Sequence, residues 1–219
     1  MTTPKEMQEG LVSHYQLEEA SGTRFDAWGV TNLTPRNTPG NAAGKLGFAV
    51  DLVAASAQNL DAVTTIEQDI RTSWQVAAWV YLSATATGDQ MILSQYTNSD
   101  QRQFTLERLD SSGEILFIVS DSVTGDSVSV SSSTFGAVPL ETWVFVEAWN
   151  DADISEIGVA VNLTADTTTH ADGQYNGGKN NYTIANQAYG SYWNGRVDET
   201  SIWDRVLTPE QSASPKRSQ

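Results

Sequence analysis

The sequence predicts an all-β protein whose strands form a two-sheet antiparallel sandwich. Apolar and polar residues alternate in short runs, and clusters of Gly, Asn, Asp, Ser and Thr separate these runs. Helical periodicity is nearly absent, and this combination is typical of an all-β chain. The 219 residues fit one large sandwich, and 7 Trp, 7 Tyr and 6 Phe are enough to fill its core.

Strands are expected along most of the chain. The clearest covers residues 74–82, where five apolar side chains share one face and two aromatic rings share the other. Both of its faces should therefore be covered. Val128 and Val130 alternate with serines, as in a half-exposed edge strand, and Thr208 with Pro209 predicts one capped helical turn. The expected strands are residues 11–17, 46–53, 74–82, 90–97, 102–109, 114–121, 143–149, 156–163 and 195–206.

The chain is expected to form one domain with two long loops. Residues 26–45 are rich in Asn, Gly and Pro, and residues 164–180 are rich in Thr, Gly and Asn. Loops of this length in a compact β domain are often functional. No linker or internal repeat divides the chain, so we expect a sandwich over residues 11–211. It should be flanked by an N-terminal arm (1–10) and a C-terminal tail (212–219).

Composition excludes several classes of protein. The net charge of −15 repels phosphate backbones, so we expect no nucleic-acid partner. No apolar run approaches the roughly 20 residues of a membrane helix, so we expect no membrane insertion. The absence of cysteine excludes disulfides and thiolate metal sites. Residues 1–10 lack the apolar core of a signal peptide, which favours a virion component assembled in a host cytoplasm over an extracellular protein.

Several segments resemble one known family. The opening GLVSHYQLEEASGTRFDAWGVTNLT, the strands WQVAAWVYL, TWVFVEAWND and IGVAVNLT, and the closing NGRVDETSIWDRVLTPEQ follow one another as in laminin-G-like, concanavalin-A-like domains. The resemblance spans roughly residues 10–211. It implies a jelly roll of two antiparallel sheets, a scaffold that serves sugar binding, adhesion and virion assembly alike. Fold alone therefore does not decide the function.

The resemblance also implies a structural calcium ion. Asp26 and Asn32 flank a Gly-containing loop, and Asp198 lies in the closing strand that pairs near the opening one in this family. These three residues would supply side-chain oxygens, the ligands that Ca²⁺ prefers. The alternative is that Asp26 is a turn residue and Asp198 a hydrogen-bond partner at a strand end. A second acidic segment, residues 150–156, is interpreted as a solvated hairpin tip.

No catalytic pattern is visible in the sequence. The glucanase motif Glu-x-Asp-x-x-Glu is absent, and the adjacent Asp198 and Glu199 should point to opposite faces of their strand. Glu147 lies in a strand without an acidic neighbour at alternate positions. The histidines, His14 and His170, accompany no nucleophile motif. We therefore expect a protein that is not an enzyme.

Aromatic residues in or near loops are the candidate ligand contacts, because sugar rings stack on exposed Trp and Tyr beside Asn and Asp. Packing under a long loop is the alternative for each of them. The candidate carbohydrate-binding residues are Trp28, Tyr175, Tyr189, Tyr192 and Trp193.

The sequence therefore predicts a non-catalytic, lectin-like module displayed on a phage particle, as a head-decoration or tail protein. Its expected partners are glycans or a cell-surface polysaccharide, and other virion proteins or further copies of itself. A stand-alone carbohydrate-binding module is the alternative, and a glycoside hydrolase is less favoured.

Overall fold

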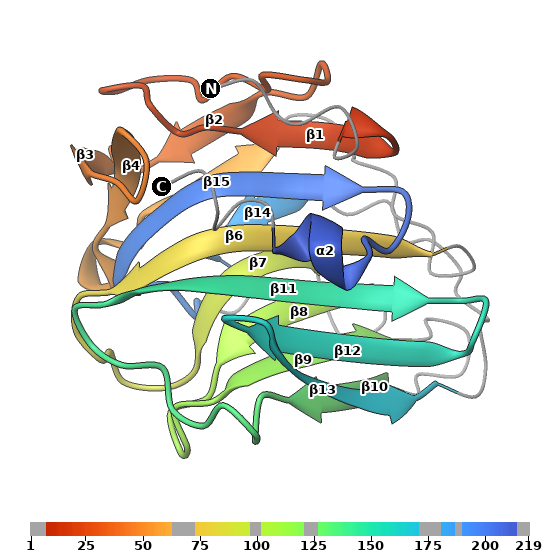
Figure 1. The fold of residues 1–219 in the computed structure, drawn as a ribbon. Coiled ribbons are helices and arrows are strands. Elements are labelled where there is room, and N and C mark those ends of the chain that lie inside the picture. Colours follow the sequence, from red (N-terminus) through yellow and green to blue (C-terminus); the bar gives the residue numbers. More distant parts are fainter. Residues whose placement is uncertain are drawn as a thin grey trace.

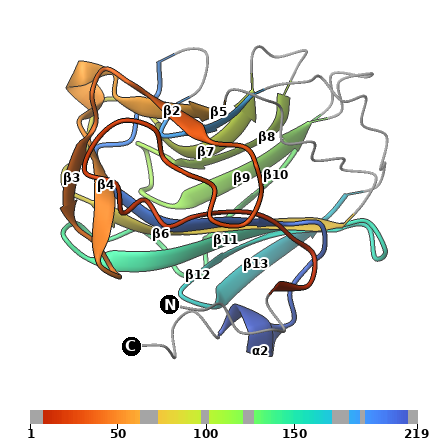
Figure 2. The same ribbon diagram turned by 90° about the horizontal axis from the view of Figure 1, so that it is seen from above.

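The computed structural model describes residues 8–62, 73–96, 102–120, 127–170, 181–186 and 190–213. They form two antiparallel sheets that pack face to face, as Figures 1 and 2 show from two directions. The all-β sandwich predicted from the sequence is confirmed. No helix in the described ranges is long and apolar enough to cross a membrane.

The first sheet has eight strands in the order β13-β12-β11-β6-β15-β4-β3, with β1 also paired to β15. Its longest strands, β6, β11 and β15, lie side by side at its centre (Figure 1). The strand bounds are β1 Leu11–Tyr15, β3 Gly40–Ala43, β4 Phe48–Leu52, β6 Trp74–Leu82, β11 Trp143–Asp151, β12 Glu156–Val161, β13 Thr164–Thr169 and β15 Gly195–Trp203.

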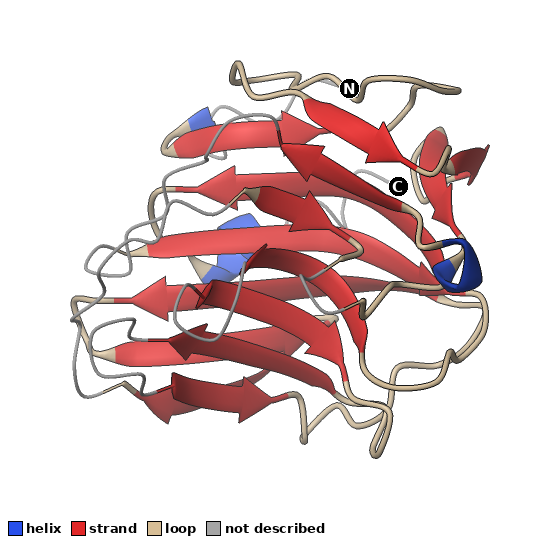
Figure 3. Ribbon diagram, turned by 180° about the vertical axis from the view of Figure 1, so that it is seen from behind, coloured by secondary structure: helices blue, strands red, loops and turns tan. Residues whose placement is uncertain are grey.

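The second sheet has seven strands in the order β10-β9-β8-β7-β14-β5-β2. Figure 3 shows the molecule from behind, with strands dominating the fold and helix confined to short turns. The strand bounds are β2 Leu33–Arg36, β5 Asn59–Ala62, β7 Gln90–Tyr96, β8 Arg102–Arg108, β9 Ile115–Ser120, β10 Ser127–Ser131 and β14 Tyr182–Ile184. The helical turns are η1 (Ala54–Ser56) and α2 (Pro209–Ser212).

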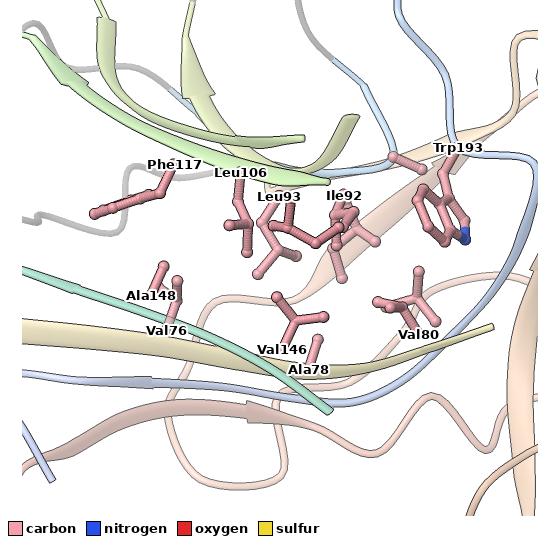
Figure 4. Close-up of a cluster of buried hydrophobic side chains, with 14 of the residues drawn as sticks. Val76, Ala78, Val80, Ile92, Leu93, Leu106, Phe117, Val146, Ala148 and Trp193 are labelled. Atoms are coloured by element: carbon pink, nitrogen blue, oxygen red, sulfur yellow. The ribbon is translucent and has the colours of Figure 1, made fainter. Parts of the chain in front are cut away.

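The main core lies between the two sheets. Ile92, Leu93, Leu106 and Phe117 of the seven-stranded sheet face the eight-stranded sheet, and Trp193 closes one end of the layer (Figure 4). The five alternate side chains of β6 that were expected on one face all belong to this core: Trp74, Val76, Ala78, Val80 and Leu82. Removal of this apolar surface from water is the main force that holds the sheets together.

A second, smaller cluster covers the outer face of the eight-stranded sheet, the face turned away from the other sheet. It joins Leu11, Trp79, Phe145, Trp203 and Leu207. The α2 turn lies in front of this sheet (Figure 1) and begins with the predicted cap. The side chain of Thr208 accepts a hydrogen bond from the Gln211 amide. The side chain of Gln211 accepts one from the Thr208 backbone amide, which completes a capping box.

All nine expected strands exist, with ends that shift by a few residues. The two segments expected to be loops are corrected: residues 26–45 contain β2 and β3, and residues 164–180 begin with β13. The predicted edge strand is confirmed, because β10 lies at the end of its sheet. Residues 171–180 lie outside the described residues, as do most of the predicted arm and tail, so that domain division stays a prediction.

Candidate functional site

Asp26 organises the loop in which it lies. Its carboxylate accepts hydrogen bonds from the backbone amides of His14, Trp28 and Gly29 at 2.8–3.1 Å, and from Thr31 at 3.4 Å. The amide of Asp26 itself donates to Asn32 Oδ1 at 3.0 Å. Asp26 and Asn32 are therefore brought together, as predicted, but their oxygens bind the loop's own backbone.

Asp198 belongs to a different network. Its Oδ2 accepts hydrogen bonds from the amides of Lys45 and Leu46 at 2.8 and 3.0 Å, which fixes the turn between β3 and β4. The side chain is fully buried, and Oδ1 has no hydrogen-bond partner within the described ranges. Burial raises the pKa of Asp198 to about 7, although the two amide hydrogen bonds oppose this shift.

These contacts do not fit a single calcium shell built from Asp26, Asn32 and Asp198. The first two residues use their oxygens on the backbone of one loop, and Asp198 serves another turn. Among the described residues, no group of three or more His, Asp or Glu side chains could hold a metal ion. The calcium site implied by the family resemblance therefore stays a prediction without a supporting contact.

The aromatic candidates fall into three groups. Trp28 is 47 % exposed and Tyr192 is half-buried, so both rings present some surface. Trp193 is fully buried in the main core, which corrects its assignment as a sugar contact because its ring is not open to a ligand. Tyr175 and Tyr189 lie outside the described residues.

The prediction that Asp198 and Glu199 point to opposite faces of their strand is wrong, because β15 contains a bulge. The pairing with β6 shifts register between Asp198 and Ser201, and Glu199 has a φ of +47°. Asp198 lies opposite Trp79 on the outer face, and Glu199 contacts His14 on the same face. The two acids therefore share a face, contrary to expectation, but the burial of Asp198 keeps it from a substrate.

The same bulge assembles a serine, a histidine and a glutamate. His14 Nδ1 lies 2.8 Å from Ser201 Oγ, and His14 Nε2 lies 3.1 Å from Glu199 Oε2. The sequence alone does not predict this set, because β1 and β15 come from opposite ends of the chain. Ser201 is only 6 % exposed, so these contacts tie β1 to β15 and do not offer an open nucleophile.

The outer face of the seven-stranded sheet carries a row of hydroxyl groups. Thr183, Ser94 and Thr105 lie opposite one another on β14, β7 and β8, and their apolar neighbours in sequence point into the core. Ser94 and Thr183 both donate to the carbonyl of Asn186 at 2.6 and 2.7 Å. The buried Thr105 Oγ1 has no hydrogen-bond partner in the described part of the chain. We call these three residues the hydroxyl row.

Two carboxylates lie on the described strands of this sheet, and they are far apart. Glu107 on β8 alternates with the core residue Leu106 and points outward; Asp61 on β5 lies opposite Thr183. Three strand spacings separate β8 from β5, or about 14 Å. Paired acids in glycoside hydrolases need about 5–5.5 Å or 6.5–9.5 Å. Asp61 also forms a salt bridge, in which Arg36 Nε lies 2.8 Å from Asp61 Oδ2.

A protein-family model described as the Concanavalin A-like lectin/glucanases superfamily matches residues 57–212, more than half of the chain. A search of curated proteins found no match. Domain 4 of AbnA, a GH43 extracellular arabinanase from Geobacillus stearothermophilus, in complex with arabinotriose, has a similar structure. The TM-score is 0.72 at 17 % identity, over 93 % of this chain and 97 % of that one.

Toxin binding domains share the fold as well. The binding domain of Paraclostridial Mosquitocidal Protein 1 matches with a TM-score of 0.76 at 10 % identity, over 97 % of this chain and 53 % of that one. The binding domain of botulinum neurotoxin DC in complex with SialylT matches with a TM-score of 0.71 at 11 % identity, over 97 % and 52 %. The present chain thus spans about half the length of these toxin domains, and at such identities the likeness shows the fold alone.

Proposed function

Since the chain belongs to the Concanavalin A-like lectin/glucanases superfamily, we propose that it is a non-catalytic, lectin-like module that binds carbohydrate. The family offers sugar binding and sugar hydrolysis, and the observation that favours binding is the separation of Glu107 from Asp61. Two acids on strands about 14 Å apart do not act together on one glycosidic bond.

The site that we propose is the outer face of the seven-stranded sheet at the hydroxyl row and Glu107. Ser94, Thr105 and Glu107 are 0 %, 1 % and 7 % exposed, so a sugar reaches them only by displacing what covers them. Hydroxyl and carboxylate groups on a sheet face exchange hydrogen bonds with sugar hydroxyls, and the unpartnered Thr105 oxygen is the group that gains most from a ligand. The structural relative with bound arabinotriose makes arabino-oligosaccharides the first ligands to test. Trp28 and Tyr192 stay additional candidates for stacking.

Titration calorimetry of Thr105→Val and Glu107→Gln tests this site, after a glycan array has identified a ligand. Each variant should bind about three- to tenfold more weakly, the effect of one lost hydrogen bond. Thr167→Val on exposed β13 of the other sheet is the matched control and should bind like the wild type. A folded protein that retains no glycan at millimolar ligand would contradict the proposal, as would equal losses in Thr105→Val and the control.

Display on a virion, as a head-decoration or tail protein, is the setting that we propose for this module. The absence of cysteine supports it, because proteins assembled in a reducing cytoplasm rarely rely on disulfides. Light scattering during size-exclusion chromatography, with and without purified phage heads or tails, is the test. A strict monomer that binds neither particle would count against virion display while leaving the sugar proposal untouched.

A further inference from the structure

Residues 25–30, which we call the 25–30 loop, expose three large apolar side chains. Phe25 is 59 % exposed, Trp28 47 % and Val30 95 %. Elsewhere in the described ranges, no six consecutive residues expose more than two large apolar side chains. Single exposed apolar residues need no explanation, whereas three within six residues indicate a surface that meets an apolar environment.

The backbone of this loop is unusual, because its amides are already hydrogen bonded inside the protein. Six of the seven amide N–H groups from Phe25 to Thr31 donate to protein acceptors; the exception is Val30. Three of the six donate to the Asp26 carboxylate. Polar backbone groups normally make it costly to move a loop out of water. In this loop the cost of the N–H groups is largely removed, while the apolar side chains stay outside.

The base of the loop is fixed to the sandwich. Arg24 and Leu33 exchange two backbone hydrogen bonds of 2.9 Å, and both residues are fully buried. The Tyr15 hydroxyl donates to the Thr31 carbonyl at 2.6 Å. In Figure 1 the chain between β1 and β2 runs along the upper edge of the molecule, outside both sheets. The loop therefore presents its apolar side chains on a fixed support.

We propose that the 25–30 loop inserts its apolar side chains into the interfacial region of a lipid bilayer with zwitterionic headgroups. Residues 25–32 contain no Lys or Arg, and the neighbouring Glu18 and Glu19 are acidic, so the loop lacks the basic residues that attract anionic lipid. The net charge of −15 further opposes an anionic surface. The sequence predicts no membrane insertion because no apolar run is long enough to span a bilayer; the contact that we propose departs from that prediction and is peripheral.

Other occupants fit the loop less well. A sugar could stack on Trp28, but sugar recognition also needs hydrogen-bond donors, and the Trp28 and Gly29 amides beside that ring already donate to Asp26. A stable protein interface takes roughly 20–30 residues a side, far more than one six-residue loop supplies. A bilayer interface needs only a few apolar side chains, and Trp and Phe are the aromatic residues that occur there.

Co-sedimentation of the full chain with phosphatidylcholine vesicles tests this inference. The wild type should partition onto these vesicles, and Trp28→Ala should weaken partitioning about tenfold. Phosphatidylserine in the vesicles should reduce binding at low salt. Ile154→Ser, which removes an exposed apolar side chain from the turn between β11 and β12, is the matched control and should leave partitioning unchanged.

Three results would overturn the inference. The first is that the wild type does not sediment with phosphatidylcholine vesicles. The second is that Trp28→Ala loses glycan binding while its vesicle binding stays unchanged, which makes the loop a sugar site. The third is a wild-type dimer in light scattering that Trp28→Ala dissolves, which makes the loop an interface between copies. Glycan titrations of the Thr105 variant without vesicles report on the proposed function separately.

Discussion

Replacing Asp198 by Asn should remove a pH dependence of folding stability. Burial raises the pKa of Asp198 to about 7 from its ordinary value of 3.8. The folded protein thus holds a proton between these two pH values that the unfolded chain releases, so the free energy of unfolding falls as pH rises through this window. This difference in the pKa of Asp198 between the folded and unfolded states lowers the free energy of unfolding by roughly 4 kcal/mol between pH 3.5 and pH 8.

Guanidinium denaturation followed by Trp fluorescence at several pH values, in EDTA, measures this difference. Asn keeps an oxygen that accepts the Lys45 and Leu46 amides, so Asp198→Asn should gain stability relative to the wild type as pH rises from 4 to 8. Asp153→Asn, at an exposed hairpin turn, is the control for a general loss of negative charge. Parallel curves for the wild type and Asp198→Asn would refute the reasoning.

Four further measurements probe other features. Gly158→Ala should cost about 1–3 kcal/mol in calorimetry, because a Cβ there overlaps the Trp149 ring; an unchanged Tm would mean that the ring moves freely. Asp26→Ala should cost about 2 kcal/mol and speed amide hydrogen exchange in the 25–30 loop, with unchanged exchange as the contrary result. Trp74→Ala should cost about 3–5 kcal/mol by chemical denaturation, and less than 1 kcal/mol would contradict its core position. The predicted calcium ion would raise the Tm by several degrees in millimolar calcium relative to EDTA, and equal Tm values would exclude it.

The long strands could be predicted because burial imposes a regular spacing of apolar residues on their sequences. In β6 the alternation from Trp74 to Leu82 reports which side chains face the core, and the structure confirms it. The short strands show no such spacing of apolar residues; they are β2, β3, β5, β13 and β14. In β13, the sequence TADTTT has the composition of a loop, and only pairing with β12 makes it a strand.

The candidate site was harder to predict because its geometry depends on contacts between distant residues. Trp193 lies amid Asn and Gly and was interpreted as a loop aromatic, but it fills the end of the core. The bulge at Glu199, which turns two adjacent acids to one face, has no signature in a single sequence. The hydroxyl row was missed because one Ser or Thr in a strand carries no information until the register aligns three of them.

The position of β15 has a consequence for how the chain folds. Gly195–Trp203 is the last strand in the sequence, yet it pairs with β1, β4 and β6 at the centre of the larger sheet. Bringing such distant segments together costs the chain conformational entropy before the contacts between them form. This entropy cost slows folding. During synthesis, one edge of β6 stays without its partner until β15 has left the ribosome. That unpaired apolar edge is where a nascent or truncated chain would associate with another copy.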